Sequence, residues 1–272
     1  MPWTSEHLEW LLDTGERLTT ADGKTVQVWE FRHENDDAIL TSWARHFRNH
    51  YCLDTEIDSL RKGYAHSRGE YLRQIKFPDA SSPPGPSIRA GDFAEILVAD
   101  YIEYVLQYWV PRTRWNCKTV RNESAKGCDI MGFNVLDDEV DSPKDALAIF
   151  EVKAQFTGAR ARGRLQEAVD GSAKDPIRKA ESLNAIKQRL LDKKQLQDAQ
   201  RVERFQNIED RPFKEVSGAV ALLSTSVVDA KSIVATKANG HPNAKNLILL
   251  VIHGNDMMKL VHELYTRAAD EA

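Results

Sequence analysis

The chain has 272 residues, which is enough for one large domain or a core with a sizeable accessory part. Its hydrophobic fraction of 42% and charged fraction of 29% are ordinary for a globular protein. The net charge of −4 excludes the strongly basic class of nucleic-acid-binding domains. Any contact with nucleic acid would therefore need a local basic patch or the charge of a bound metal.

The cysteines and the apolar runs indicate the compartment. Cys52, Cys117 and Cys128 include no CxxC pair and form no disulfide framework. The N-terminal stretch MPWTSEHLEWLLDTGE is acidic and amphipathic, which is not typical of a signal peptide. No apolar run approaches the roughly 20 residues that a membrane helix needs. We therefore expect a reduced, soluble, cytoplasmic protein with no membrane contact.

Residues 1–87 are predicted to form an accessory α+β region. A strand is expected over 24–31, and apolar residues at helical spacing predict a helix over 38–51. A second helix with polar faces is expected over 54–71. The stretch DASSPPGPS at 79–87 is too rich in proline and glycine for regular structure, so it is predicted to be a loop.

Residues 88–272 carry the predicted core. A stretch that is apolar nearly all round predicts a buried helix over 91–109, and Pro111 ends it. Further elements are predicted in chain order: strands at 113–120, 128–136 and 146–153, an arginine-rich loop at 158–164, a helical insertion at 176–205, strands at 217–225 and 246–253, and a helix at 256–269. This order predicts an α/β fold with a central mixed sheet flanked by helices.

The strand predicted at 146–153 carries the most informative side chains. Glu151 and Lys153 are two residues apart, so they point to the same face of the sheet. A neighbouring strand that begins at 128 would place Asp129 beside them. Two carboxylates and an ammonium in an apolar run are costly to bury without a function. Two acids and a lysine in this arrangement are typical of the active site of a metal-dependent nuclease.

The order of elements and four positions resemble the PD-(D/E)xK nuclease superfamily. The positions are Glu95 on the buried helix, then Asp129, Glu151 and Lys153 on successive strands. The resemblance implies a restriction-endonuclease-like core in which Asp129, Glu151 and the Val152 carbonyl bind Mg²⁺, with Mn²⁺ able to substitute. Lys153 would position the attacking water, and Glu95 would be an outer ligand of the metal or the water. Mg²⁺ suits this donor set, because it prefers oxygen ligands and keeps several waters.

A narrower resemblance covers more of the chain. The blocks RAGDFAEIL (89–97), NESAKGCDI (122–130) and IFEVKAQ (149–155) are similar to the HamA nucleases of bacterial Hachiman antiphage defence. The stretch from Gly91 to Glu95 departs from the first block of that family. The resemblance implies a DNA endonuclease or nickase that works with a superfamily 2 helicase partner, HamB.

Several polar residues near the motif are candidates for contacts with DNA. Gln155 continues the face of Glu151 and Lys153, although it is also compatible with a polar strand end. The remaining candidates are Lys118 and Lys126 near the predicted hairpin, and Arg160 and Arg162 in the following loop. A solvated loop or hairpin accounts for these four residues equally well.

Other interpretations stay open at this point. Glu95 could be a buried carboxylate paired with an arginine, and Asp129 could cap a turn. His46 and His50 have the spacing of a zinc pair, but without an evident third ligand an ordinary helix surface is favoured. For the whole chain, the alternatives are a catalytically silent interaction subunit with a nuclease fold, and a phosphodiesterase acting on RNA or small nucleotides.

Overall fold

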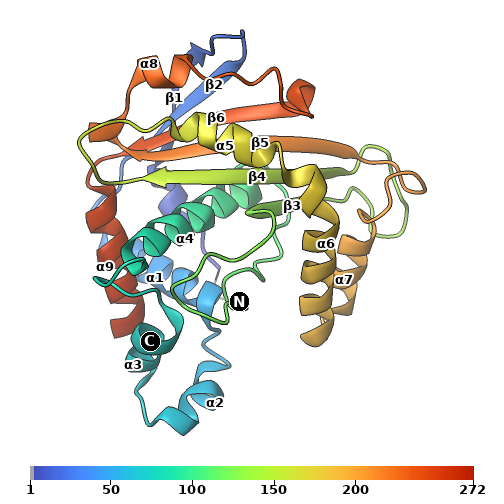
Figure 1. Ribbon diagram of the computed structural model, residues 1–272. Coiled ribbons are helices and arrows are strands. Elements are labelled where there is room, and N and C mark those ends of the chain that lie inside the picture. The colour runs from blue at the N-terminus through green and yellow to red at the C-terminus, as the bar shows by residue number, and fades with distance from the viewer. Residues whose placement is uncertain (1–2) are drawn as a thin grey trace.

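A six-stranded mixed sheet runs through the computed structural model, which describes residues 3–272 (Figure 1). The strands lie in the order β1-β2-β6-β5-β4-β3. Their bounds are β1 Leu11–Thr19, β2 Thr25–Phe31, β3 Ile130–Asn134, β4 Ala146–Gln155, β5 Lys214–Ser224 and β6 Leu247–Gly254. The four inner strands β2, β6, β5 and β4 are parallel to one another. The edge strands β1 and β3 pair antiparallel with β2 and β4. The predicted mixed α/β fold is confirmed.

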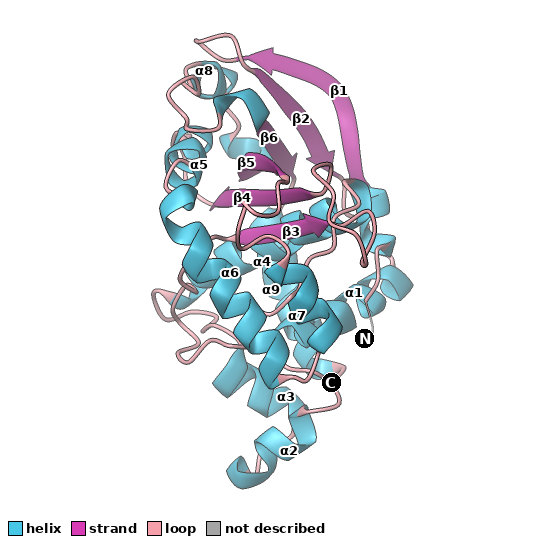
Figure 2. Cartoon of the chain, turned by 90° about the vertical axis from the view of Figure 1, so that its right-hand side faces the viewer, coloured by secondary structure: helices cyan, strands magenta, loops and turns pink. Residues whose placement is uncertain are grey.

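Helices cover both faces of this sheet. Their bounds are α1 Asp37–Tyr51, α2 Ile57–Arg61, α3 Arg68–Tyr71, α4 Gly85–Asp100, α5 Arg164–Ser172, α6 Asp175–Asp192, α7 Leu196–Glu203, α8 Ala230–Val234 and α9 Met257–Asp270. Helices α1, α4 and α9 lie against one face, and α5 lies against the other (Figure 1). Helices α6 and α7 form a hairpin that projects beside β3 (Figure 2). No helix within residues 3–272 is long and apolar enough to cross a membrane.

The apolar pattern of β4 sets the two faces of the sheet. Phe150 and Val152 belong to the core beneath α4, whereas Leu147 and Ile149 pack with α6 and α7. Because side chains alternate along a strand, Glu151 continues the second face. Strands β5 and β6 are nearly continuous apolar runs, as expected for parallel strands that are buried on both sides.

The first 87 residues contribute to the same sheet as the rest of the chain. Strand β2 pairs in parallel with β6, and α1 packs against α9. The sequence did not predict β1, whose residues are mostly exposed and polar. Such a composition is usual for an edge strand, because charged side chains discourage pairing with other chains.

Other predictions of secondary structure differ from the observed elements. The predicted strand at 113–120 is a loop, and the insertion at 176–205 is two helices separated by a turn in which Lys194 has a φ of 58°. Helix α4 begins at Gly85, inside the predicted loop, because Pro86 at the start of a helix needs no N–H partner. Helix α5 was missed, because no element was assigned between the predicted loop at 158–164 and the helical insertion at 176–205.

Candidate active site

Asp129 follows a tight turn and lies where β3 begins. Gly127 in that turn has a φ of 93°, a conformation that favours glycine. The Val152 N–H donates to Asp129 Oδ2 at 3.1 Å. The Val152 carbonyl points to the same edge of β4, because the N–H and C=O of one strand residue point the same way. The antiparallel pairing of Ile130 with Phe150, continued by one residue, sets Asp129 opposite Glu151.

Glu151 and Lys153 form a partly buried ion pair on β4. The Lys153 ammonium donates to Glu151 Oε1 at 2.5 Å. Burial and the Asp129 carboxylate raise the pKa of Glu151. Burial disfavours the Lys153 ammonium, but its bond to Glu151 outweighs that effect and raises the pKa of Lys153. Lys153 is therefore a cation at neutral pH, with its charge shared with Glu151.

Arg114 connects Glu95 to Asp129. Its guanidinium donates to Glu95 Oε2 and to Asp129 Oδ1, both at 2.8 Å, and to the Cys128 carbonyl at 2.7 Å. Burial raises the pKa of Glu95 to about 7 although Arg114 opposes the shift. Glu95 is thus paired with an arginine, as one of the sequence interpretations anticipated. The sequence did not single out Arg114, which lies in a loop that was predicted to be a strand.

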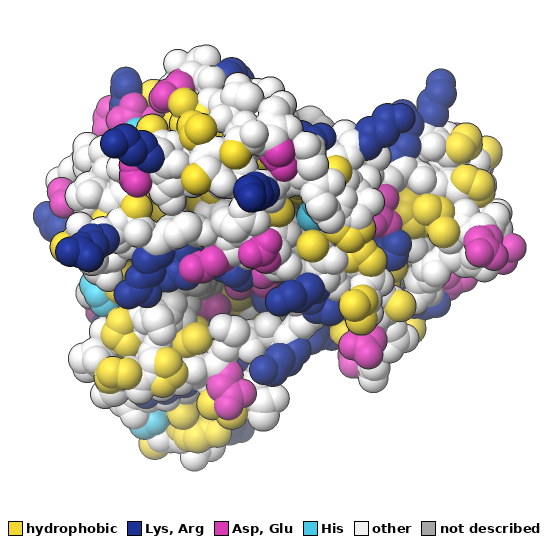
Figure 3. All heavy atoms as spheres, turned by 45° about the horizontal axis from the view of Figure 1, so that its top comes forward, with side chains coloured by type: hydrophobic (Ala, Val, Ile, Leu, Met, Phe, Trp, Pro, Cys, Tyr) yellow, Lys and Arg dark blue, Asp and Glu magenta, His cyan; other side chains and the backbone are white. Residues whose placement is uncertain are grey.

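A cleft of about 720 Å³ opens beside these residues. Glu95, Arg114, Asp129 and Lys153 line it, and the Val152 backbone reaches it as well. On the face drawn in Figure 3, Lys and Arg side chains lie along a recess, with acidic side chains among them. The cleft is wide enough for a phosphodiester group, and its charges are of both signs.

The residues considered for DNA contacts differ in their surroundings. Arg162 lines the cleft, and Arg160 and Lys126 are exposed. Gln155 is buried and holds the following loop, because it donates to the Arg160 carbonyl at 2.8 Å and accepts from the Arg162 N–H at 3.0 Å. Lys118 donates to Asp92 at 2.6 Å, and its side chain is 5% exposed. Arg162 is therefore the best placed of the five for a phosphate.

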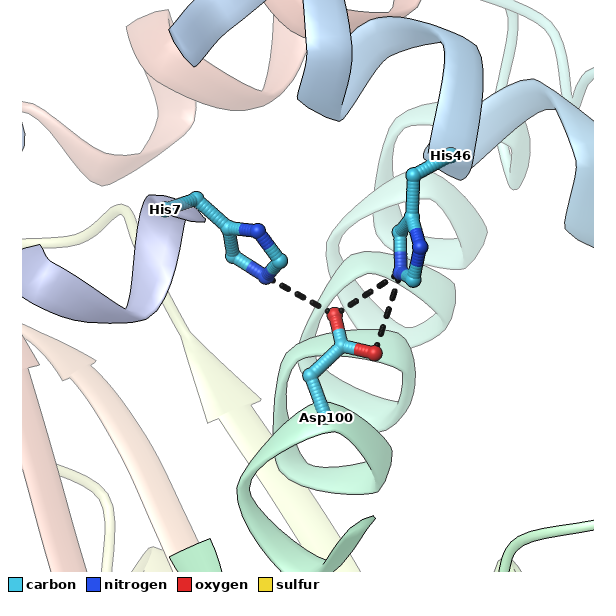
Figure 4. Close-up of side chains that lie close together, drawn as sticks. All are labelled: His7, His46 and Asp100. Carbon is cyan, nitrogen blue, oxygen red and sulfur yellow. Dashed lines mark hydrogen bonds and ion pairs between the residues drawn. The ribbon is translucent and has the colours of Figure 1, made fainter. Parts of the chain in front are cut away.

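A second charged cluster surrounds Asp100 in the interior (Figure 4). His7 and His46 contact the Asp100 carboxylate at 2.9 and 3.0 Å, and all three side chains are fully buried. Their ligand atoms lie within 4.8 Å of one another, as in a metal site. His50 is also fully buried, so the expectation that His46 and His50 lie on an ordinary helix surface is wrong.

The hydrogen bonds of this cluster surround the Asp100 carboxylate, although the buried His7 Nδ1 has no partner among the described residues. The Thr4 N–H donates to His46 Nδ1 at 3.3 Å, which leaves the ring proton on Nε2, the atom that faces Asp100. A protonated Nε2 has no lone pair for a metal. Arg112 donates to Asp100 and, at 2.8 Å, to His50 Nε2, so the cation of this cluster is a guanidinium. In this arrangement the cluster is a structural network.

Sequence reasoning missed the acid at the centre of that network. Asp100 occurs in the stretch ILVADYI, where an acid between apolar residues signals a buried partner. The identity of its partners could not be predicted, because His7 is distant in the chain and Arg112 lies in a loop without a periodic pattern. Asp175, whose role is considered below, was missed for the same reason.

The fold and the site define an α/β protein with two carboxylates and a lysine gathered at adjacent strands beside a cleft. The sequence model of the HamA family matches residues 6–268, and the chain belongs to that family. Membership indicates an antiphage defence protein of the Hachiman type. No curated protein matches the chain.

Proposed function

We propose that the chain is a Mg²⁺-dependent nuclease that cleaves or nicks DNA as the effector of Hachiman defence. Its main support is the grouping of Asp129, Glu151 and Lys153, in which one oxygen of the buried Glu151 carboxylate has no hydrogen-bond donor among residues 3–272. An orphaned buried carboxylate oxygen is costly unless a cation or a proton accompanies it. The oxygen-only donor set suits a hard cation such as Mg²⁺, and Mn²⁺ would substitute.

Each residue of the site has a separate task in this proposal. Asp129, Glu151 and the Val152 carbonyl would hold the ion, which would polarise the phosphate and lower the pKa of a bound water. Lys153 keeps its proton and stabilises negative charge that grows on the phosphate oxygens. Glu95, with a pKa of about 7, is able to accept a proton from an outer water.

A helicase partner of the HamB type would complete the function. The net charge of −4 gives the chain a weak electrostatic attraction for DNA on its own. Figure 3 shows acidic side chains among the basic ones along the recess, which limits that attraction further. A superfamily 2 helicase that binds DNA would therefore deliver the strand to the cleft.

Cleavage of supercoiled plasmid tests this function. The wild-type chain, with and without the partner, is expected to nick or degrade the plasmid in Mg²⁺ or Mn²⁺. Glu151→Ala and Lys153→Ala should each abolish cleavage, whereas Lys245→Ala, at an exposed lysine, should cleave like the wild type. Absence of cleavage in every combination, or equal cleavage by all variants, would refute the proposal.

The Arg114 bridge favours one alternative, a catalytically silent subunit that keeps the nuclease fold as a scaffold. Arg114 donates to both Glu95 and Asp129, so each of these two acids has a partner without a metal. Calorimetric titration with Mn²⁺ separates the two functions, because a scaffold would bind no ion at this site. Binding that is lost in Asp129→Asn would support the nuclease.

A further inference from the structure

Asp175, the first residue of α6, adds an acid to the surroundings of Glu151. The two residues are 3% and 4% exposed. Both carboxylate oxygens of Asp175 and Oε2 of Glu151 are buried, and no N–H or O–H donor among the described residues bonds to them. The nearby Cys128 thiol, a weak donor, is the one group whose hydrogen bonding lowers the pKa of Asp175. Buried carboxylates are normally hydrogen-bonded or paired, so three orphaned oxygens indicate that a positively charged ligand is missing from this place.

The turn between α5 and α6 brings the two acids together. Gly171 packs directly on Glu151, because a Cβ atom at this position would lie 2.5 Å from Glu151 Oε1. The chain then turns back, with the Lys174 N–H bonded to the Gly171 carbonyl at 3.0 Å, and α6 begins at Asp175. Of the charges around Asp175, that of Glu151 acts on it most strongly.

The cations nearby do not form hydrogen bonds with these three oxygens. Lys153 bonds to the opposite oxygen of Glu151. Arg178 lies 3.7 Å from Glu151 Oε2, but it donates to the Gly171 carbonyl at 2.8 Å. Four carboxylates of the region therefore face three cations and leave a formal charge of −1. The carboxylates are those of Glu95, Asp129, Glu151 and Asp175, and the cations are Arg114, Lys153 and Arg178.

The chemistry of these buried carboxylate oxygens favours a hard cation. Without a metal, burial and Glu151 raise the pKa of Asp175 to about 7, so a proton partly replaces the missing charge. Burial also raises the pKa of the adjacent Cys128 thiol to about 12, which keeps that sulfur protonated. The available ligands are oxygens, and oxygen ligands favour Mg²⁺ or Mn²⁺ over zinc.

We propose that Asp175 is a metal ligand and binds one divalent cation together with Glu151. The α5–α6 turn thus supplies a ligand that lies outside the acid-x-lysine strand. This inference rests on the proposed function and extends it, since the same Glu151 carboxylate serves both. The proposed ligand also places the first turn of α6 in contact with the metal.

Metal binding to the full chain tests the role of Asp175. Mn²⁺ is titrated by calorimetry into the wild type, Asp175→Asn and Asp192→Asn, the last being an exposed acid at the other end of α6. Thermal unfolding is followed in EDTA and in Mn²⁺. Asp175→Asn should bind Mn²⁺ at least tenfold more weakly and lose most of the metal-induced rise in Tm. In EDTA it should unfold at or above the wild-type Tm, because a repulsive carboxylate is gone, and Asp192→Asn should match the wild type throughout.

The outcomes distinguish this inference from the nuclease proposal. If Asp175→Asn binds Mn²⁺ as the wild type does while Glu151→Gln and Asp129→Asn lose it, Asp175 is not a ligand and the nuclease site stands. If the wild type binds no Mn²⁺, or all variants bind equally, both proposals fail. A Tm in EDTA well below that of the wild type would show that Asp175 is needed for folding, which also contradicts the inference.

Discussion

The interior network around Asp100 and the candidate site around Glu151 are two buried groups of charges that are built differently. In the first, the Asp100 carboxylate accepts from His7, His46 and Arg112. In the second, both oxygens of Asp175 and one oxygen of Glu151 have no N–H or O–H donor within residues 3–272. A carboxylate surrounded by donors is satisfied by the protein alone, whereas one without donors requires something from outside. Both regions bury charge, and carboxylate oxygens without such donors distinguish the candidate site from the Asp100 network.

Removal of the acid from the Asp100 network should have the largest effect on stability. Asp100→Asn leaves the buried Arg112 without its main carboxylate, although Glu103 still contacts it. We expect the free energy of unfolding to fall by about 3–5 kcal/mol in urea titration. Mn²⁺ affinity of the folded fraction should be unchanged. A stable protein with altered Mn²⁺ binding would show instead that the Asp100 network is a metal site.

Arg114→Met tests the bridge between the two acids of the cleft. In EDTA the free energy of unfolding of the variant should be lower by about 2 kcal/mol. This loss is smaller than that for a fully charged buried pair, because Glu95 can take up a proton and become neutral. Mn²⁺ should then stabilise the variant more than the wild type, since the ion no longer competes with a guanidinium. Equal stabilisation of both proteins by Mn²⁺ would show that Arg114 does not compete with a metal ion for the two acids.

Gly171→Ala tests how closely α5 approaches Glu151. Alanine would gain roughly 1 kcal/mol of helix propensity, but its Cβ would push the Glu151 carboxylate aside. We expect roughly tenfold weaker Mn²⁺ binding by calorimetry. Gly63→Ala, at an exposed glycine outside the cleft, is the control, because a Cβ there also meets nothing within 4 Å. Unchanged Mn²⁺ affinity in Gly171→Ala would mean that Glu151 binds no ion in its present position.

The two regions should also respond to pH with opposite sign. Burial lowers the pKa of His50 well below 6.5, so the unfolded chain takes up a proton that the folded one refuses, and stability is lost as pH falls below 6.5. Asp175 has the opposite effect. Its pKa is about 7 in the folded protein and 3.8 in the unfolded chain, so stability is lost as pH rises from about 4 to 7. Each slope should be about 1 kcal/mol per pH unit.

Single variants separate these two slopes. Urea titrations at pH 5, 6 and 7 should show that His50→Gln weakens the loss of stability on acidification. Asp175→Asn should weaken the loss on the approach to pH 7. If both variants change the pH dependence of stability in the same direction, the two regions do not respond to pH with opposite sign.

The strands that carry the motif were predictable because their apolar pattern is local. The runs that became β4, β5 and β6 are buried, and burial needs apolar residues whatever the partner strand. Strand β1 was missed because an edge strand is exposed and polar. The start of α4 was missed because proline and glycine end a helix interior but are compatible with its first turn.

The candidate site was predictable only in part. Glu151 and Lys153 share a strand, so their proximity follows from spacing alone. Arg114 and Asp175 reach the same region from a loop and from a helix start, and no periodic pattern links them to β4. Their contribution depends on how the helices pack, which a single sequence does not encode in its spacing. The unpaired oxygens became visible only in three dimensions.

The pairing of β2 with β6 has a consequence for how the protein is made. Residues 26–31 find their parallel partner only when residues 249–254 have left the ribosome. Until then β2 and β5 each present an open edge, and such edges promote aggregation. A chain interrupted before β6 should therefore be cleared as misfolded protein. Synthesis through residue 254 is thus a condition for any stable product of this chain.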